Sequence, residues 1–197
     1  MSNDPNDLRA FVFKNRGALL ALPAIALALG GKPSRCSARM GVPIAIAGEL
    51  LRCWAVGYSG VTTRDDAVEA PELVTAGPYA YVRNPLYVGN FVTALGFAIA
   101  FTGKCSAARR FVAVAGSLGI MAAVYATIVP HEEAFLRSRF GDDFEHYTQN
   151  VPPVVPRTTA WEEGRGTWRP EVIREAESRT FLTFGAMLAA LVFKLRR

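Results

Sequence analysis

The fold is decided at residues 77–102, which are GPYAYVRNPLYVGNFVTALGFAIAFT. The first half of this stretch is polar and turn-forming, and the second half is an almost unbroken apolar run. Pro85 stands where one half gives way to the other, and proline is tolerated in the first turn of a helix. The stretch therefore predicts a membrane helix that begins at a polar entrance. An ionisable side chain at such a place costs free energy and is a candidate functional group.

Five apolar blocks of this kind occur along the chain, at residues 16–30, 40–58, 86–102, 111–129 and 181–193. A helix needs about 20 mostly apolar residues to cross a bilayer, so the first and last blocks are marginal in length. No segment alternates at period two for long enough to suggest a membrane barrel. The sequence predicts an all-α, polytopic membrane bundle of about five helices, forming one domain over residues 1–197. We interpret the first block as a retained helix and not as a signal peptide.

The composition excludes several classes of function. Hydrophobic residues make up 51% of the chain, and the net charge of +5 comes from 22 basic and 17 acidic side chains. The basic residues flank the apolar blocks, which is typical of headgroup anchors and not of a nucleic-acid surface. Three widely separated cysteines and two histidines predict neither a disulfide framework nor a metal site.

Two carboxylates, Glu132 and Glu133, follow the fourth apolar block. If a helix ends there, the pair faces the negative end of its dipole, whereas a new helix starting at Pro130 would hold the pair favourably in its first turn. Adjacent side chains on a helix point in different directions, so one glutamate can reach a site while the other points elsewhere. A cationic ligand would stabilise either arrangement.

A further charged pair lies inside the second block. Glu49 and Arg52 are three residues apart, so they share a helix face and can form an ion pair. Such a pair can serve only to make the helix tolerable in lipid, or Arg52 can line a polar cavity between helices. Residues 171–179, just before the last block, carry alternating charges at helical spacing, which predicts a solvated helix.

Three motifs together resemble one known family. They are LV–GPY–VRNP–Y–G at residues 73–89, EE–L–FG–F–Y at residues 132–147, and VPPVVPR at residues 151–157. These residues are similar to the isoprenylcysteine carboxyl methyltransferase and phospholipid methyltransferase superfamily. The resemblance implies a core at about residues 48–157, followed by an extension, residues 158–197, with a further membrane or interfacial helix.

The resemblance implies an integral membrane enzyme that uses S-adenosylmethionine to methylate a lipid-like acceptor, without metal or nucleic acid. The residues that it assigns to the cofactor are Gly77, Pro78, Tyr79, Val82, Arg83, Asn84, Pro85, Tyr87, Gly89, Glu132, Glu133 and Tyr147. It assigns catalytic roles to Glu133 and Arg157. On physical grounds, a glutamate can hold the amino group of the cofactor, Arg83 or a helix N-terminus its carboxylate, and Tyr79 or Tyr87 its adenine or sulfonium.

The acceptor stays open between an isoprenylcysteine-type carboxylate, a phospholipid amine and a small hydrophobic molecule. Methylation of a carboxylate needs no base, whereas an ammonium must first lose a proton. Glu133, His131 and His146 are candidate bases for that step.

The topology predicted from charge conflicts with the topology predicted from chemistry. Basic residues in segments 32–39 and 103–110 favour a cytoplasmic position for these two loops. A cytoplasmic methyl donor requires the two polar clusters to face the cytoplasm instead. We expect the cofactor site on the cytoplasmic side, a choice supported by five arginines on that side: Arg64, Arg83, Arg137, Arg139 and Arg157.

Two other classes of function are compatible with the sequence. An NADPH-dependent membrane reductase of the sterol-reductase type resembles the chain at Arg83, Tyr87 and Gly89, but the GPY motif and the glutamate pair favour the methyltransferase. A non-catalytic membrane scaffold would use the polar clusters only as anchors. Anchoring does not require the arginine of the first motif to meet the glutamates of the second.

Overall fold

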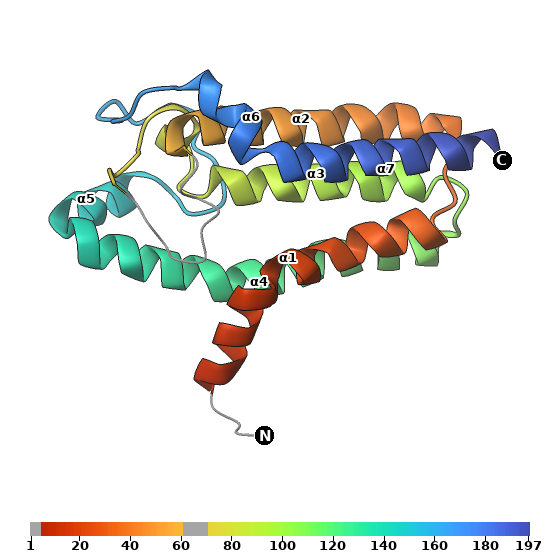
Figure 1. Ribbon diagram of the computed structural model, residues 1–197, viewed down its shortest axis with the longest axis horizontal. Helices are drawn as coiled ribbons and strands as arrows, with labels where there is room; N and C mark the ends of the chain where they lie inside the picture. Colours follow the sequence, from red (N-terminus) through yellow and green to blue (C-terminus); the bar gives the residue numbers. More distant parts are fainter. Residues whose placement is uncertain (1–4, 61–70) are drawn as a thin grey trace. The chain divides into compact units, whose positions relative to one another are not determined.

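The computed structural model describes residues 5–60 and 71–197 (Figure 1), so Arg64 lies outside the described residues. These residues form seven α-helices and two short 3-10 helices, and no strand occurs among them. The prediction of an all-α fold is confirmed. The elements are α1 (Pro5–Gly30), α2 (Arg35–Ser59), η2 (Gly77–Ala80), α3 (Pro85–Phe101), α4 (Ala107–Phe140), α5 (Asp142–Asn150), η3 (Pro170–Val172), α6 (Ile173–Ala176) and α7 (Ser178–Arg196).

Three of the described helices are long and apolar enough to cross a membrane by length and composition, namely α2, α4 and α7. Two shorter apolar helices accompany them, Asn15–Gly30 within α1 and the 17-residue α3. Each of the five predicted apolar blocks therefore lies in its own helix. The last block, predicted to be marginal, belongs to a helix of 19 residues.

The end of the fourth block differs from both arrangements considered for it. Helix α4 does not stop at Val129, and no new helix begins at Pro130, because α4 runs through this proline to Phe140. Proline removes one main-chain donor inside a helix, and the α4 main chain continues in spite of that cost. Glu132 and Glu133 consequently lie within a helix and not at one of its ends.

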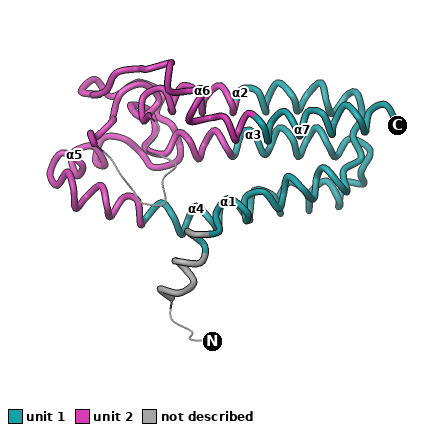
Figure 2. Tube along the Cα trace, in the orientation of Figure 1, with its two compact units in different colours: residues 1–47, 91–130, 182–197 teal, residues 48–90, 131–181 magenta. Residues whose placement is uncertain are grey.

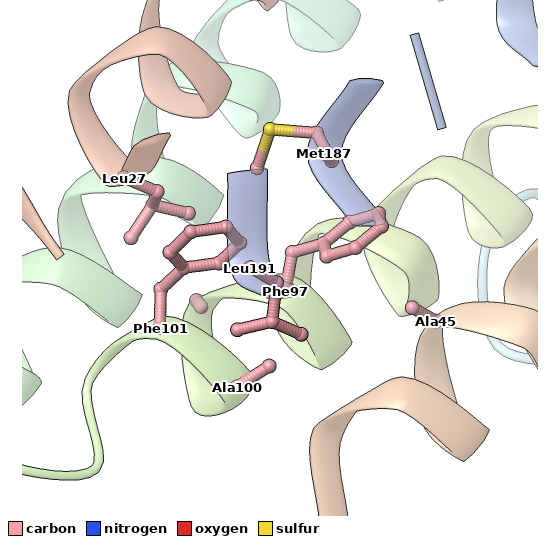
Figure 3. Close-up of a cluster of buried hydrophobic side chains, with 8 residues drawn as sticks. Leu27, Ala45, Phe97, Ala100, Phe101, Met187 and Leu191 are labelled. Carbon is pink, nitrogen blue, oxygen red and sulfur yellow. The ribbon is translucent and has the colours of Figure 1, made fainter. Parts of the chain in front are cut away.

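The chain divides into two compact units, shown in different colours in Figure 2. Unit 1 comprises residues 1–47, 91–130 and 182–197. Its apolar core joins α1, α2, α3 and α7, and Figure 3 shows side chains of these helices converging. The buried members are Leu27, Ala45, Phe97, Ala98, Ala100, Phe101, Met187 and Leu191.

Helices α2 and α3 approach each other closely within unit 1. A Cβ atom added to Gly96 would lie 2.6 Å from the carbonyl oxygen of Gly41 and 2.7 Å from the Cα of Ala45. The hydroxyl of Thr93 donates to the carbonyl oxygen of Ala45 at 3.3 Å. Small residues therefore allow two apolar helices to pack main chain against main chain, as is common in membranes.

Unit 2 comprises residues 48–90 and 131–181 and contains both polar motifs. Its small apolar core consists of Phe144, Tyr147 and Val151, with Leu136 and Trp161 among the side chains packed around it. Helix α5 supplies the first two of these residues, and Val151 ends that helix by donating its N–H to the carbonyl oxygen of Tyr147 at 3.0 Å. This core fixes the segment that follows α4 against the segment that precedes α3.

Candidate functional site

The entrance to α3 is a tight turn whose shape depends on glycine and proline. Gly77 begins η2 with a φ of +61°, and a Cβ atom at this position would collide with the ring of Tyr58. Pro78 and Val82 are buried beneath the turn. The carbonyl oxygen of Asn84 then accepts the first N–H groups of α3, from Tyr87 and Val88, both at 3.1 Å. Positive φ is costly for residues other than glycine, so the turn itself requires the glycine of the GPY motif.

Arg83 and Glu133 form an ion pair between the two motifs. The Nε of Arg83 donates to Oε1 of Glu133 at 2.9 Å, and the two side chains are only 12% and 18% exposed. The Nη1 of Arg83 also donates to the carbonyl oxygens of Thr148 and Val151, at 3.2 and 2.7 Å. Arg83 thus holds the end of α5 and α4 together at one guanidinium, whose five donors suit such a junction.

Tyr87 and Glu132 form the second link between the motifs. The phenol of Tyr87 lies 2.7 and 2.8 Å from the two carboxylate oxygens of Glu132 and donates to this carboxylate. Glu132 and Glu133 therefore point toward different partners, as expected for neighbours on a helix. Both partners belong to the stretch that opens α3, so the two polar clusters meet in space.

Two tyrosines, Tyr79 and Tyr147, link η2 to α5. The phenol of Tyr147 donates to the carbonyl oxygen of Tyr79 at 2.8 Å. Burial raises the pKa of Tyr79 to about 12, and the negative charge of Glu132 contributes to the same shift. Burial also raises the pKa of Tyr147, again with a neighbouring glutamate, Glu133, opposing ionisation. Both phenols therefore stay neutral near pH 7 and can donate but not act as bases.

The remaining polar residues of the motifs contact the tail after α5. The amide of Asn84 donates to the carbonyl oxygen of Pro153 at 3.0 Å. The main-chain N–H of Arg157 donates to the carbonyl oxygen of Tyr81 at 2.9 Å, and its Nη1 donates to that of Asn150 at 2.8 Å. In this structure Asn84 and Arg157 tie the tail to the entrance of α3.

Gly89 lies close to helix α2. A Cβ atom at Gly89 would lie 2.7 Å from Cγ of Arg52 and 2.9 Å from the carbonyl oxygen of Gly48. The close approach that this glycine permits is therefore that of α2. Pro85, its partner in the motif, is fully buried as the first residue of α3.

A second buried charged group surrounds Arg52 on α2. Its Nη2 lies 2.8 and 2.9 Å from the two carboxylate oxygens of Glu177, and its Nη1 donates to Oδ1 of Asn90 at 2.6 Å. Oε2 of Glu49 lies 4.0 Å from Nε of Arg52, which agrees with the ion pair predicted from the spacing of the two residues. Arg52 is 8% exposed and Glu177 is 0% exposed.

Glu177 is a functional candidate that the sequence analysis missed. The prediction for its segment holds in part, because the four charged residues on which it rested are exposed, namely Glu171, Arg174, Glu175 and Arg179. The segment is not one continuous helix, because η3 ends at Val172, the four-residue α6 ends at Ala176, and α7 begins at Ser178. Glu177 is completely buried at this junction. A sequence signal was present, since Glu177 is the last acidic residue before an apolar helix, but nothing local identified its partner 125 positions earlier.

The titratable side chains His146 and Glu163 of the same unit are more exposed than Arg52 and Glu177. His146 lies on α5 with its Nε2 3.2 Å from Oε2 of Glu163, and both side chains are more than half exposed. Among the described residues, no three His, Cys, Asp or Glu side chains are grouped so that they could hold a metal ion.

Curated proteins similar to the chain carry two kinds of name. A protein-S-isoprenylcysteine O-methyltransferase of Schizosaccharomyces pombe is 38% identical over 43% of the chain and 33% of its own length. The protein-S-isoprenylcysteine O-methyltransferase B of Arabidopsis thaliana is 30% identical over 59% of the chain and 57% of its own length. The cobalt-zinc-cadmium resistance protein CzcN of Cupriavidus metallidurans is 31% identical over 68% of the chain and 53% of its own length.

The chain thus spans between a third and three fifths of the length of these relatives. No solved structure is significantly similar to it. The family model described as phospholipid methyltransferase matches residues 38–143, which is more than half of the chain and includes both Arg83 and the glutamate pair. The chain therefore belongs to the phospholipid methyltransferase family, within the superfamily that also contains the isoprenylcysteine carboxyl methyltransferases.

Proposed function

We propose that this protein is an integral membrane methyltransferase that transfers the methyl group of S-adenosylmethionine to a lipid-like acceptor. The observation that carries the proposal is the meeting of Arg83 and Tyr87 with Glu133 and Glu132 inside the segment matched by the family. These four side chains join the entrance of α3 to α4 across 45 to 50 positions of sequence. Simple anchoring of two helices does not require so many convergent polar groups.

The chemistry of this donor set fits the amino-acid part of S-adenosylmethionine. That part carries one ammonium and one carboxylate, and the Arg83–Glu133 pair offers one opposite charge to each. Glu132 or Glu133 would accept hydrogen bonds from the ammonium, and Arg83 would hold the carboxylate. The faces of Tyr79 and Tyr87 would lie against the adenine or the sulfonium. When bound, the cofactor supplies an electrophilic methyl group on a positively charged sulfur.

The side chains of the chain itself would act by positioning and by excluding water. Arg83 and Glu133 are mostly buried, so their charges interact through a medium of low polarity and hold a ligand in one orientation. Neutral Tyr79 and Tyr147 add no competing negative charge near the site. The catalytic roles predicted for Glu133 and Arg157 are part of this proposal, with Glu133 the better placed of the two because it contacts Arg83.

The acceptor would enter from the bilayer. Within unit 2, α2 exposes apolar side chains such as Leu50, at 63%, and Trp54, at 42%. Large exposed apolar side chains on a helix long enough to cross a membrane are suited to contact lipid. The proposal includes a polytopic bundle in a single domain, with the cofactor site on the cytoplasmic side, where the methyl donor is made. Carboxylate, amine and small hydrophobic acceptors all stay open.

The test is calorimetric titration of S-adenosylhomocysteine into the detergent-purified protein. We expect saturable binding in the micromolar range, with Kd of about 1–100 μM, and its loss in Glu133→Ala. The matched control is Glu163→Ala, an exposed glutamate of the same unit. NADPH is titrated in parallel. Binding of NADPH with no response to S-adenosylhomocysteine would replace this proposal by the reductase, and no binding of either would favour the scaffold.

A further inference from the structure

The segment that follows the second motif is tied to unit 2 at regular intervals. Residues 157–177, here named the C-terminal strap, lie wholly beyond the segment matched by the family. Up to residue 169 the strap is not helical, yet every fourth residue makes a main-chain hydrogen bond to an earlier part of unit 2. These bonds run from Arg157 N–H to Tyr81 O (2.9 Å), Trp161 N–H to Ala80 O (2.9 Å), Thr75 N–H and Ala76 N–H to Arg165 O (2.8 and 2.9 Å), and Arg169 N–H to Gly57 O (2.7 Å).

The strap ends in the buried ion pair of Arg52 and Glu177. Both oxygens of the glutamate face one guanidinium nitrogen at 2.8 and 2.9 Å, and the glutamate is 0% exposed. The hydroxyl of Thr180, in the first turn of α7, accepts from the same nitrogen at 3.4 Å. Removing one partner of such a pair leaves a buried charge without compensation, so loss of Glu177 would destabilise the end of the strap.

The same guanidinium reaches helix α3. Nη1 of Arg52 donates to Asn90 at 2.6 Å, and the aliphatic part of Arg52 covers Gly89. Tyr87, which donates to Glu132, lies three residues before Asn90, and residues at that spacing share a helix face. Glu177 therefore holds Arg52 in place, and Arg52 in turn holds the first turns of α3.

The strap also covers the turn that precedes α3. The ring of Trp161 lies over Tyr147, with centroids 5.7 Å apart and planes inclined by 31°, and Tyr147 donates to the carbonyl oxygen of Tyr79. The strap residues Arg157 and Trp161 bond to the main chain just after Tyr79. The strap is thus in contact with the residues proposed to surround the cofactor.

We propose that Glu177 is a positioning residue of the methyl-transfer site, acting through Arg52 and the C-terminal strap on the first turns of α3 and the turn of Tyr79. The inference rests on the proposed function and deepens it, because it adds a segment outside the family match to the cofactor site. A buried ion pair adds little net stability compared with apolar side chains of the same volume. Its contribution here is to select one geometry of the strap and of α3.

The experiment compares Glu177→Gln with the wild-type protein and with Glu175→Gln, an exposed glutamate two residues earlier in the strap. Two quantities are measured: the Kd of S-adenosylhomocysteine, and the rate at which trypsin cleaves the strap after its exposed arginine Arg165, which is followed by Gly166. We expect Glu177→Gln to weaken binding about tenfold and to accelerate cleavage about tenfold, as for typical couplings between sites. Glu175→Gln should match the wild type in both.

Glu177→Asp keeps the carboxylate and should recover part of the affinity, which also covers the case in which Glu177→Gln does not fold. Faster cleavage with unchanged affinity would reduce Glu177 to a structural anchor and overturn the positioning role. Unchanged cleavage and unchanged affinity would overturn the strap as well. If the wild-type protein binds no S-adenosylhomocysteine, the proposed function fails and the positioning role with it, while faster cleavage in Glu177→Gln would still establish the fastening of the strap.

Discussion

The Nε of Arg83 lies 2.9 Å from Oε1 of Glu133, although fifty positions separate the two residues in the sequence. Arg83 stands just before α3, and Glu133 lies seven residues before the end of α4. The intervening chain is an apolar helix and the first three quarters of another. The two polar motifs therefore meet because two neighbouring helices run in opposite directions and return to the same end.

Arg83→Ala should lower the free energy of unfolding by about 2–4 kcal/mol, because Glu133 and two carbonyl oxygens would lose a mostly buried charged partner. The control is Arg137→Ala, whose pair with Glu145 is about half exposed and should contribute nothing measurable. Chemical denaturation in detergent micelles measures both. Equal stabilities of the two variants would contradict the central place given to Arg83.

Tyr87→Phe should weaken the binding of S-adenosylhomocysteine about tenfold, because a hydrogen bond to a charged group contributes about 1.5–3 kcal/mol. The ring is preserved, so only the donor to Glu132 is lost. Tyr58→Phe, whose ring packs against Gly77, is the matched control and should leave the affinity unchanged. A Tyr87→Phe variant with wild-type affinity would remove Glu132 from the proposed cofactor site.

Gly96→Ala should destabilise the protein by about 1–3 kcal/mol, the usual cost of overpacking a close contact. Its new methyl group would be forced against the main chain of α2 at Gly41 and Ala45. Gly116→Ala on α4 has nothing within 4 Å of the added Cβ and should stabilise the helix by about 0.5–1 kcal/mol. Thermal unfolding of the two variants side by side checks the opposite signs.

The stability of the protein should fall as the pH rises from about 10 to about 12. The pKa of Tyr79 is raised to about 12 by burial, so in this interval the unfolded state releases a proton that the folded state retains. The stabilisation by neutral Tyr79 is fully present below pH 10 and is lost as the pH rises through the pKa of the folded state. The slope is at most about 1.4 kcal/mol per pH unit for one group. Tyr147 contributes in the same direction. Unfolding measured from pH 8 to 12 should show a shallower decline in Tyr79→Phe, and an identical decline would contradict the assignment.

The helices could be predicted from local sequence because the length and the apolar composition of each block are properties of that segment alone. The start of α3 was also predictable, since Pro85 can occupy only the first turn of a helix without losing a bond. The end of α4 was not predictable in this way. Pro130 indicated a boundary, but Glu132 and Glu133 on the turn after it are held by Tyr87 and Arg83, and these contacts stabilise a continuous helix.

The candidate site was likewise predictable only in part. The sequence by itself determined the all-α fold with its apolar helices, the family, and the residue types from which a site could be made, because apolar periodicity and motif chemistry are properties of short segments. Only the tertiary structure decided that Arg83 meets Glu133, that the neighbour of Gly89 is α2, and that Glu177 is buried against Arg52. A charged side chain just before an apolar helix can either be exposed to water or be buried against a partner of opposite charge. The choice depends on whether a guanidinium 125 positions earlier lies within hydrogen-bond distance, and only the packing of the helices brings it there.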